Sequence, residues 1–108
     1  MRFEWDEEKN TVNIRNHKID FADVPAIFNG PMLVELDERE DYGEDRWIGL
    51  GFLRNILAVV VFTERRQDTI RIISTRKANR YERRRYEQAL KNGLAETPGN
   101  DRRGDRLL

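Results

Sequence analysis

The strongest chemical signal in the sequence is a concentration of basic side chains towards its C-terminal end. Residues 71–108 carry 11 Lys and Arg against 5 Asp and Glu, a net charge of +6. Residues 1–70 carry 9 Lys and Arg against 15 Asp and Glu, a net charge of −6, so the overall charge of zero conceals halves of opposite sign. This asymmetry favours an anionic ligand on the basic side, although the two halves could also attract each other.

A helix predicted over about residues 77–92, capped by Ser74 or Thr75, gathers much of this charge on one face. At about 100° per residue, the cations fall on one side and the aromatic residues Tyr81 and Tyr86 on the other. Guanidinium groups bind phosphate oxygens through paired hydrogen bonds, so such a face can lie along a nucleic-acid backbone. A solvated helix face, or a surface that docks an acidic partner, has the same pattern. The cations are Arg76, Lys77, Arg80, Arg83, Arg84 and Lys91.

Further arginines lie shortly before this helix. Arg65 and Arg66 fall in a predicted turn, and Arg71 lies in the strand that follows it. Together with the helix, these residues could bring cations to one end of a sheet, where several donors would hold one anion. Loop arginines also serve simply as solvated surface residues, and the sequence favours neither interpretation.

The first predicted helix begins after Asp6, runs to about Asn16 and carries polar residues at spacing i, i+4 and i+8. Lys9, Asn13 and His17 therefore share one face. Histidine is the side chain that ordinarily changes charge near neutral pH, so His17, the only histidine, is a candidate for proton transfer. A lone histidine near a helix end is more often a cap or a partly packed residue.

An acidic segment, residues 37–45, separates the first two predicted strands. Its carboxylates could contribute a general acid, a general base or ligands for a hard cation. Its composition is more typical of a solvated turn, or of a segment that pairs with the basic helix.

The apolar pattern predicts an α+β domain with two N-terminal helices, a four-stranded antiparallel sheet and a C-terminal helix. Residues 2–5 are expected to be an extended lead-in, and Asp20 is expected to cap a second short helix over residues 21–28.

The predicted strands follow one another directly as a meander. The third is apolar on both faces and is therefore expected to be central. Gly49 and Gly51 share one side of the second strand, which indicates a bend or a close backbone approach. The strands are predicted over residues 32–36, 46–53, 56–63 and 69–74.

Length and composition predict one domain over residues 1–94 and a disordered tail over residues 95–108. The absence of cysteine and the single histidine argue against thiolate or multi-histidine metal sites, and no motif predicts a cofactor. The longest apolar run, residues 56–62, is too short to span a bilayer, and no signal peptide is visible. A cytoplasmic protein without membrane contact is therefore expected.

Several short stretches, taken in order over residues 2–90, resemble the BrnT family of toxins. The N-terminal stretches are Phe3-Glu4-Trp5-Asp6 with Lys9 and Asn13, then His17, then Phe21-Ala22. The central stretches are Asp41-Tyr42-Gly43-Glu44-x-Arg46 with Ile48-Gly49, and Val60-x-Phe62-Thr63-x-Arg65. The last are Arg71-Ile72-Ile73-Ser74-x-Arg76-x-Ala78, then Glu82-Arg83 and Tyr86. No single stretch is specific, but their joint register is.

The resemblance implies a RelE-like ribonuclease toxin of a type II toxin–antitoxin system that inhibits translation and growth. It also implies a BrnA-type antitoxin as protein partner, and contact with operator DNA only through that antitoxin. On the same basis, Arg65 and Arg76 are expected to bind the scissile phosphate, and His17 or Lys9 to transfer a proton. The residues expected to hold the flanking phosphates of the RNA substrate are Lys77, Arg80, Arg83 and Arg84.

The corresponding chemistry is RNA cleavage without a metal ion, in which the 2′-OH attacks the adjacent phosphate and leaves a cyclic phosphate. Two alternatives remain open. The chain could be a non-catalytic module that binds nucleic acid or an acidic partner through the basic helix. It could also be an inactive toxin that acts as a co-repressor with its antitoxin, since Asn16-His17-Lys18 stands where the family usually reads Lys-His-Gly.

Overall fold

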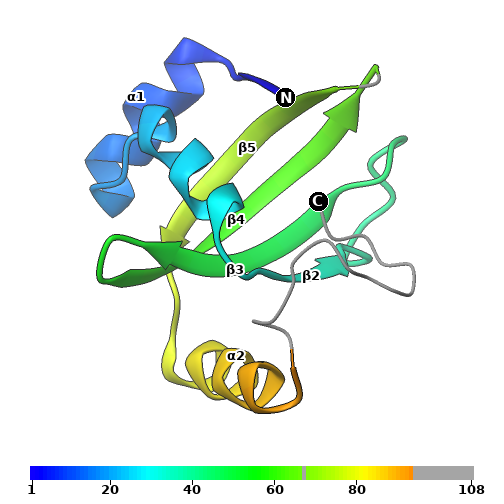
Figure 1. Cartoon of the computed structure of the whole chain (residues 1–108). Coiled ribbons are helices and arrows are strands. Elements are labelled where there is room, and N and C mark those ends of the chain that lie inside the picture. Colours follow the sequence, from blue (N-terminus) through cyan, green and yellow to red (C-terminus); the bar gives the residue numbers. More distant parts are fainter. Residues whose placement is uncertain (67, 94–108) are drawn as a thin grey trace.

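A computed structural model of the chain describes residues 1–66 and 68–93, and the predicted tail lies outside them. Its centre is a strongly curved sheet with strand order β1-β5-β4-β3-β2 (Figure 1). β1 runs parallel to β5, and the other neighbouring strands are antiparallel. The strands are β1 (Arg2–Glu4), β2 (Leu33–Leu36), β3 (Trp47–Leu53), β4 (Ile56–Arg65) and β5 (Thr69–Lys77). The helices are α1 (Glu7–His17), the 3-10 helix η1 (Phe21–Asn29) and α2 (Arg80–Lys91).

The prediction of a four-stranded antiparallel sheet after two N-terminal helices is wrong. The expected lead-in is a fifth strand, β1, in which Phe3 is in register with Ile70 and Glu4 with Arg71. The ring centroids of Phe3 and Phe28 lie 5.2 Å apart, and Arg71 Nη1 donates to Glu4 Oε2 at 3.1 Å. These contacts hold a strand too short to be stable alone. Because its partners in β5 are more than 60 positions away in the sequence, no local pattern signals the pairing.

The second predicted helix is present, but it winds as a 3-10 helix. Asp20 caps η1 as expected, and its carboxylate accepts a hydrogen bond from the Ala22 N–H at 2.9 Å. Pro25 lies inside η1, where it has no N–H to donate and disfavours the α conformation of the residue before it. We attribute the departure from an α-helix to this proline.

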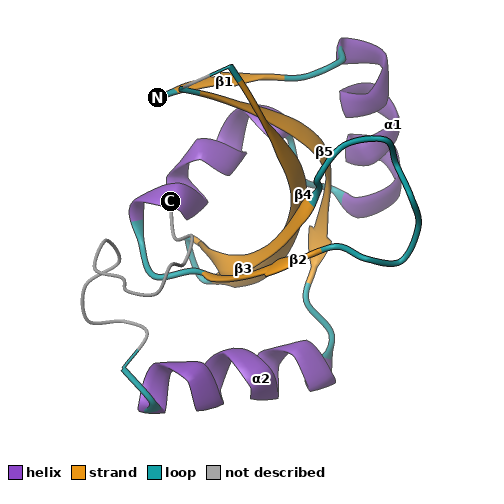
Figure 2. Ribbon diagram, turned by 90° about the vertical axis from the view of Figure 1, so that its right-hand side faces the viewer, coloured by secondary structure: helices purple, strands orange, loops and turns teal. Residues whose placement is uncertain are grey.

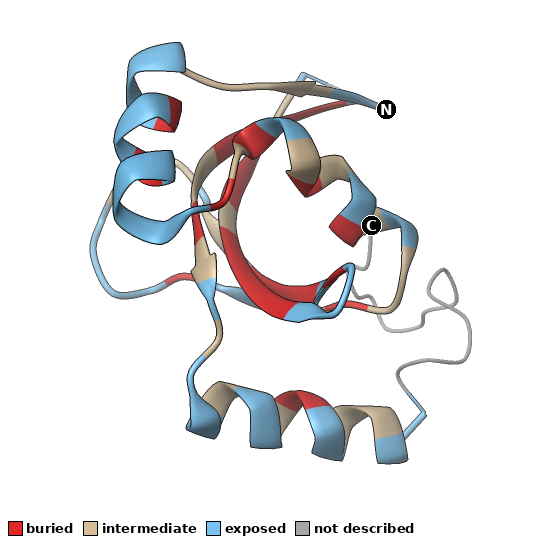
Figure 3. Ribbon diagram, turned by 90° about the vertical axis from the view of Figure 1, so that its left-hand side faces the viewer, coloured by how far each residue is buried: buried red, intermediate tan, exposed pale blue. Residues whose placement is uncertain are grey.

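The concave face of the sheet encloses the main hydrophobic core, with η1 inside the curve (Figures 2 and 3). A Cβ atom on Gly51 would lie 2.8 Å from Ile27 Cγ2, and one on Gly49 would lie 2.6 Å from Met32 Cε. The close approach predicted at these glycines is therefore confirmed. The buried core residues are Ile19, Phe21, Val24, Ile27, Met32, Leu53, Ala58, Val60, Phe62, Ile70 and Ile72.

The last strand is longer than predicted, and the last helix begins later. β5 stays paired with β4 as far as Lys77, so Ser74 and Thr75, predicted as helix caps, are strand residues. Asn79 caps α2 instead. Its side chain accepts from the Glu82 N–H at 2.8 Å, while Glu82 Oε1 accepts from the Asn79 N–H at 2.9 Å, which forms a complete capping box.

α2 lies across the convex face of the sheet (Figure 2). Tyr86 is its one buried residue, and it packs against Leu50, Leu57 and Val59. The Tyr86 hydroxyl donates to the Pro31 carbonyl at 2.9 Å, which ties the helix to the segment before β2. None of the helices that the structure describes is long and apolar enough to cross a membrane.

α1 is attached to the sheet through asparagine side chains rather than an apolar stripe. Asn10 and Asn13 are its buried residues. Asn13 Oδ1 accepts from the Thr75 N–H at 3.1 Å, and its Nδ2 donates to the Ile19 carbonyl at 3.0 Å. Asn10 Oδ1 accepts from the Phe21 N–H at 2.9 Å. The Asn13 side chain therefore provides a hydrogen-bond partner for a backbone N–H of β5 at a position that β1 does not reach.

We expect Asn13→Ala to lower the free energy of unfolding by roughly 2–4 kcal/mol, because two buried backbone groups lose their partners. Urea unfolding followed by circular dichroism measures the change. Asn16→Ala, at an exposed position of the same helix, is the matched control and should cost less than about 0.5 kcal/mol. Equal losses in the two variants would contradict the docking role of Asn13.

Candidate functional site

An irregularity in β5 decides which of its side chains reach the convex face of the sheet. The register with β4 shifts between Ile72 and Ser74, which leaves Ile73 as the extra residue of a β-bulge. Side chains alternate between the two faces of a strand, so a regular β5 would place Ser74 and Arg76 on the same face as buried Ile72. The bulge reverses this order. Ser74 and Arg76 consequently lie on the convex face rather than in the core.

Arg76 makes a two-point ion pair with Glu82, the third residue of α2. Arg76 Nη1 donates to Glu82 Oε1 at 2.9 Å, and Nη2 donates to Oε2 at 2.8 Å. A further bond runs from Nη1 to the Lys77 carbonyl at 3.2 Å. The hydrogen bonds from Arg76 lower the pKa of Glu82, and the carboxylate raises the pKa of Arg76. Both groups therefore stay charged around neutral pH.

The pair borders a pocket of about 250 Å³ between β3, β4, β5 and the start of α2. The pocket has an apolar side formed by the sheet and a polar side formed by two arginines, a serine and a glutamate. The positive charge of Arg39 lowers the pKa of Arg76 and so opposes part of the rise that Glu82 causes. The two cations are therefore close enough to interact electrostatically. Its lining residues are Arg39, Ile48, Val59, Val61, Ser74, Arg76 and Glu82.

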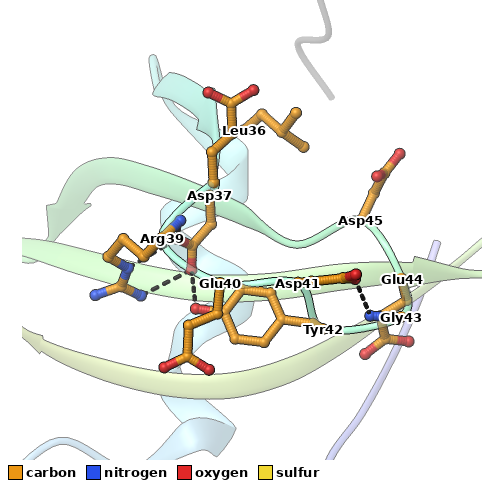
Figure 4. A pocket seen from close by; sticks show the side chains of 10 residues that line it. Leu36, Asp37, Arg39, Glu40, Asp41, Tyr42, Gly43, Glu44 and Asp45 are labelled. Atoms are coloured by element: carbon orange, nitrogen blue, oxygen red, sulfur yellow. Dashed lines mark hydrogen bonds and ion pairs between the residues drawn. The ribbon is translucent and has the colours of Figure 1, made fainter.

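The acidic segment between β2 and β3 brings Arg39 to this pocket. The buried carboxylate of Asp37 accepts from Arg39 Nε and Nη2, both at 2.7 Å, and from the Tyr42 hydroxyl at 3.2 Å (Figure 4). The Arg39 hydrogen bond outweighs burial and lowers the pKa of Asp37 to about 2. The Thr63 hydroxyl, which donates to the Asp45 carbonyl at 2.7 Å, anchors the far end. The segment is thus an ordered loop with internal ion pairs, not only a solvated turn.

A second pocket, of about 440 Å³, lies between α1 and β5. The face predicted from the i, i+4, i+8 spacing lines it, since Lys9, Asn13 and His17 are all among its residues. Ser74 lines both pockets, so Lys9 and His17 lie on one side of Ser74 and Arg76 on the other. The remaining lining residues are Asp6, Glu8, Val12, Asn16 and Ile73.

Arg65 lies apart from this arrangement. It is in register with Thr69 at the far end of β4, whereas Arg76 is in register with Val59. Six strand residues separate these positions, which corresponds to about 20 Å along the sheet. Arg65 Nη2 binds Glu44 Oε1 at 3.2 Å, so it pairs with the acidic loop. The structure places Lys9 and His17 in one pocket and Arg76 in the pocket that shares Ser74 with it, and it places Arg65 at the other end of the same strands.

The predicted phosphate-binding cations of α2 remain on its exposed surface, and Lys77 is exposed at the end of β5. Arg83 makes an ion pair with Glu87 at 3.9 Å, while Lys77, Arg80 and Arg84 have no ion pair within residues 1–66 and 68–93. Arg85, which interrupts the basic face in the sequence, turns to the sheet and pairs with Glu35 of β2.

Sequence reasoning missed Arg39, Ser74 and Glu82 as residues of the pocket. Arg39 stands among carboxylates, where its charge carries no signal, and Ser74 needs the bulge to reach the pocket. Glu82 interrupts the basic face of the helix. The spacing Asn79-x-x-Glu82 is that of a capping box, and this signal could have located both the helix start and the fixed carboxylate.

The acid sensitivity of the loop follows from Asp37. Because folding lowers its pKa from 3.8 to about 2, the ionised carboxylate stabilises the fold above pH 4, and this contribution is lost as the pH falls towards 2. We expect Asp37→Asn to be less stable than the parent protein at pH 7. Between pH 4 and 2 its free energy of unfolding should fall by less than that of the parent protein. Urea midpoints across this range test the prediction. The control is Glu40→Gln in the same loop, and identical pH slopes for Asp37→Asn and the parent protein would refute it.

No group of three or more His, Asp or Glu side chains suited to a metal ion occurs in the described part of the chain. What the two pockets offer is a fixed arginine pair, a serine hydroxyl and two groups that can exchange protons. Such a set can bind a phosphate and move protons beside it.

Comparisons with known proteins agree in one family. The BrnT ribonuclease toxins of type II toxin–antitoxin systems match this sequence over residues 5–82. The crystal structure of the Brucella abortus ribonuclease toxin BrnT is similar, with 28% sequence identity and a TM-score of 0.59, over 74% of this chain and 99% of that one. No curated protein matches the sequence. The chain therefore belongs to the BrnT family of ribonuclease toxins of type II toxin–antitoxin systems.

Proposed function

We propose that this toxin cleaves RNA at the junction of the two pockets, where Ser74 separates Arg76 from Lys9 and His17. The observation that carries the proposal is the state of Arg76. Its guanidinium is fixed by Glu82, yet its Nε–H and one Nη2–H take no partner in the described residues. These two donors form the fork that binds a phosphate through two hydrogen bonds.

The reaction is an internal transfer within the RNA. The 2′-oxygen forms a bond to the adjacent phosphorus while the bond from phosphorus to the 5′-oxygen breaks. A base takes the 2′-OH proton, an acid gives a proton to the departing 5′-oxygen, and a 2′,3′-cyclic phosphate and a 5′-OH remain. Arg76 stabilises the charge that develops on the phosphate, and the step needs no metal ion. His17 and Lys9 are the proton-transfer groups that line the adjoining pocket.

The flanking phosphates extend along the basic surface. Lys77, Arg80 and Arg84 present exposed charges without ion pairs in the described chain, and Arg83 is held only by a long contact to Glu87. Arg65, about 20 Å from Arg76 along the strands, is suited to a phosphate several nucleotides away rather than the one that Arg76 binds.

The family places the chain in a two-protein system, so an antitoxin is its protein partner. We propose that this antitoxin is of the BrnA type and that the complex contacts operator DNA only through it. The free toxin acts in the cytoplasm, where cleavage of RNA stops translation and growth.

A second function, RNA binding without cleavage, is favoured by one observation: the unpaired cations of α2 form a phosphate-binding surface that needs no catalytic group. Purified protein that retards RNA in a gel but leaves it intact would support this function. Tighter binding of operator DNA by the antitoxin when this protein is present, with RNA left intact by the protein alone, would support a co-repressor role.

We expect Arg76→Ala to lower the rate of RNA cleavage by roughly 100-fold or more, because the phosphate loses its fixed charge-assisted donors. The rate is measured on end-labelled RNA with purified protein. Arg15→Ala, which removes the same charge from an exposed position of α1, should retain the parent rate. An unchanged rate for Arg76→Ala would remove Arg76 from the site.

An RNA with a single 2′-deoxy nucleotide on the 5′ side of the cut should stay intact at that position, because the attacking oxygen is missing. The parent RNA should yield a 2′,3′-cyclic phosphate at the same rate with or without EDTA. Cleavage at the deoxy position would disprove attack by the 2′-OH, and loss of activity in EDTA would disprove metal independence.

A further inference from the structure

We propose that Glu82 is a positioning residue, which holds Arg76 so that one edge of its guanidinium stays open to a phosphate. This inference rests on the proposed function and assigns to Glu82 the orientation of the cation that binds the substrate. The alternative role of the same contact is a block, in which Glu82 competes with the phosphate for Arg76.

The count of donors favours orientation over competition. An arginine side chain has five N–H donors arranged on a planar fork. Glu82 takes one donor from Nη1 and one from Nη2, and the Lys77 carbonyl takes the second from Nη1. The donors left over are the Nε–H and the other Nη2–H, which lie on one edge and point the same way. Glu82 therefore leaves a complete phosphate-binding edge open, formed by Nε and Nη2, while it occupies the neighbouring edge formed by Nη1 and Nη2.

Glu82 itself is held from two sides, so it can fix Arg76 in turn. Its Oε1 accepts from the Asn79 N–H at 2.9 Å as well as from Arg76. Its own N–H is bound by the Asn79 side chain, and its side chain is only 16% exposed. A carboxylate held by the first turn of a helix has few accessible rotamers. Its two hydrogen bonds to Arg76 therefore restrict the rotamers of that arginine as well.

The helix is fixed in its place by a separate set of contacts. Tyr86 is buried against the sheet, and its hydroxyl donates to the Pro31 carbonyl at 2.9 Å. The ion pair of Arg85 with Glu35 adds a second tie to β2. α2 is thus held rigidly beside the pocket, and Glu82 is the side chain of α2 that fixes the position of Arg76.

The direct test is Glu82→Gln, which keeps the size of the side chain and an oxygen for the Asn79 N–H but removes the charge. We expect kcat for RNA cleavage to fall roughly 10- to 100-fold with KM changed less than about threefold, since the bound geometry is lost rather than the affinity. Glu64→Gln, which removes a carboxylate charge from an exposed position of β4, should leave both constants unchanged.

A double-mutant cycle separates positioning from a structural role. If Glu82 acts through Arg76, Glu82→Gln should change cleavage less than about twofold in an Arg76→Lys background. The Arg76 Nε–H signal in an NMR spectrum should be sharp in the parent protein and broadened by exchange in Glu82→Gln. Both variants should unfold at urea midpoints close to that of the parent protein, which shows that the fold is retained.

The outcomes are distinct. Faster cleavage or tighter RNA binding by Glu82→Gln would show that Glu82 blocks Arg76 and would overturn the proposal. Parent activity in Glu82→Gln, or an equal loss in the Arg76→Lys background, would overturn it as well. If Arg76→Ala cleaves RNA at the parent rate, the proposed function fails. If Arg76→Ala is inactive and Glu82→Gln is fully active, only the positioning role fails.

Discussion

The single extra residue in β5, Ile73, is the constraint on which the site depends. Up to Ile72 the strand turns its even-numbered side chains into the concave core. After the bulge, Ser74 and Arg76 face outward over the sheet. Without the bulge, a guanidinium would be directed into an apolar core, where an unpaired charge costs several kcal/mol. The irregularity therefore lets one strand both complete the core and supply the site, a role for which bulges are frequently used.

Two carboxylates then hold the cations that meet at this face. Asp37 fixes Arg39 from the loop between β2 and β3, and Glu82 fixes Arg76 from the first turn of α2. Each carboxylate is well shielded while its arginine is more exposed, with the Arg39 side chain 64% exposed and Asp37 fully buried. An arginine that is already held in place loses little conformational entropy when it binds an anion. The arrangement therefore favours binding through preorganised side chains rather than through a large number of charges.

Patterns that act over a few residues predicted much of the fold. The helix start at Asp6, the cap at Asp20 and the crowding around Gly49 and Gly51 all follow from local chemistry. The shared face of Lys9 and His17 follows from helix geometry alone. What escaped prediction depends on distant partners: β1 pairs with β5 across most of the chain, and the bulge exists only in the register of β5 with β4. The same reason explains why Arg39 and Glu82 were missed, because a side chain joins a site through the fold and not through its neighbours in sequence.

The central claim is that RNA binds where Ser74 joins the pockets of Arg76 and His17. An NMR titration of the protein with an RNA oligonucleotide, made uncleavable by a 2′-deoxy substitution at the cut, tests it most directly. The account predicts that the largest shifts occur at Ser74, the Arg76 Nε–H and the His17 ring, with smaller ones along α2. Shifts confined to Arg80 and Arg84 on the exposed face of α2, with Ser74 and Arg76 unmoved, would contradict it.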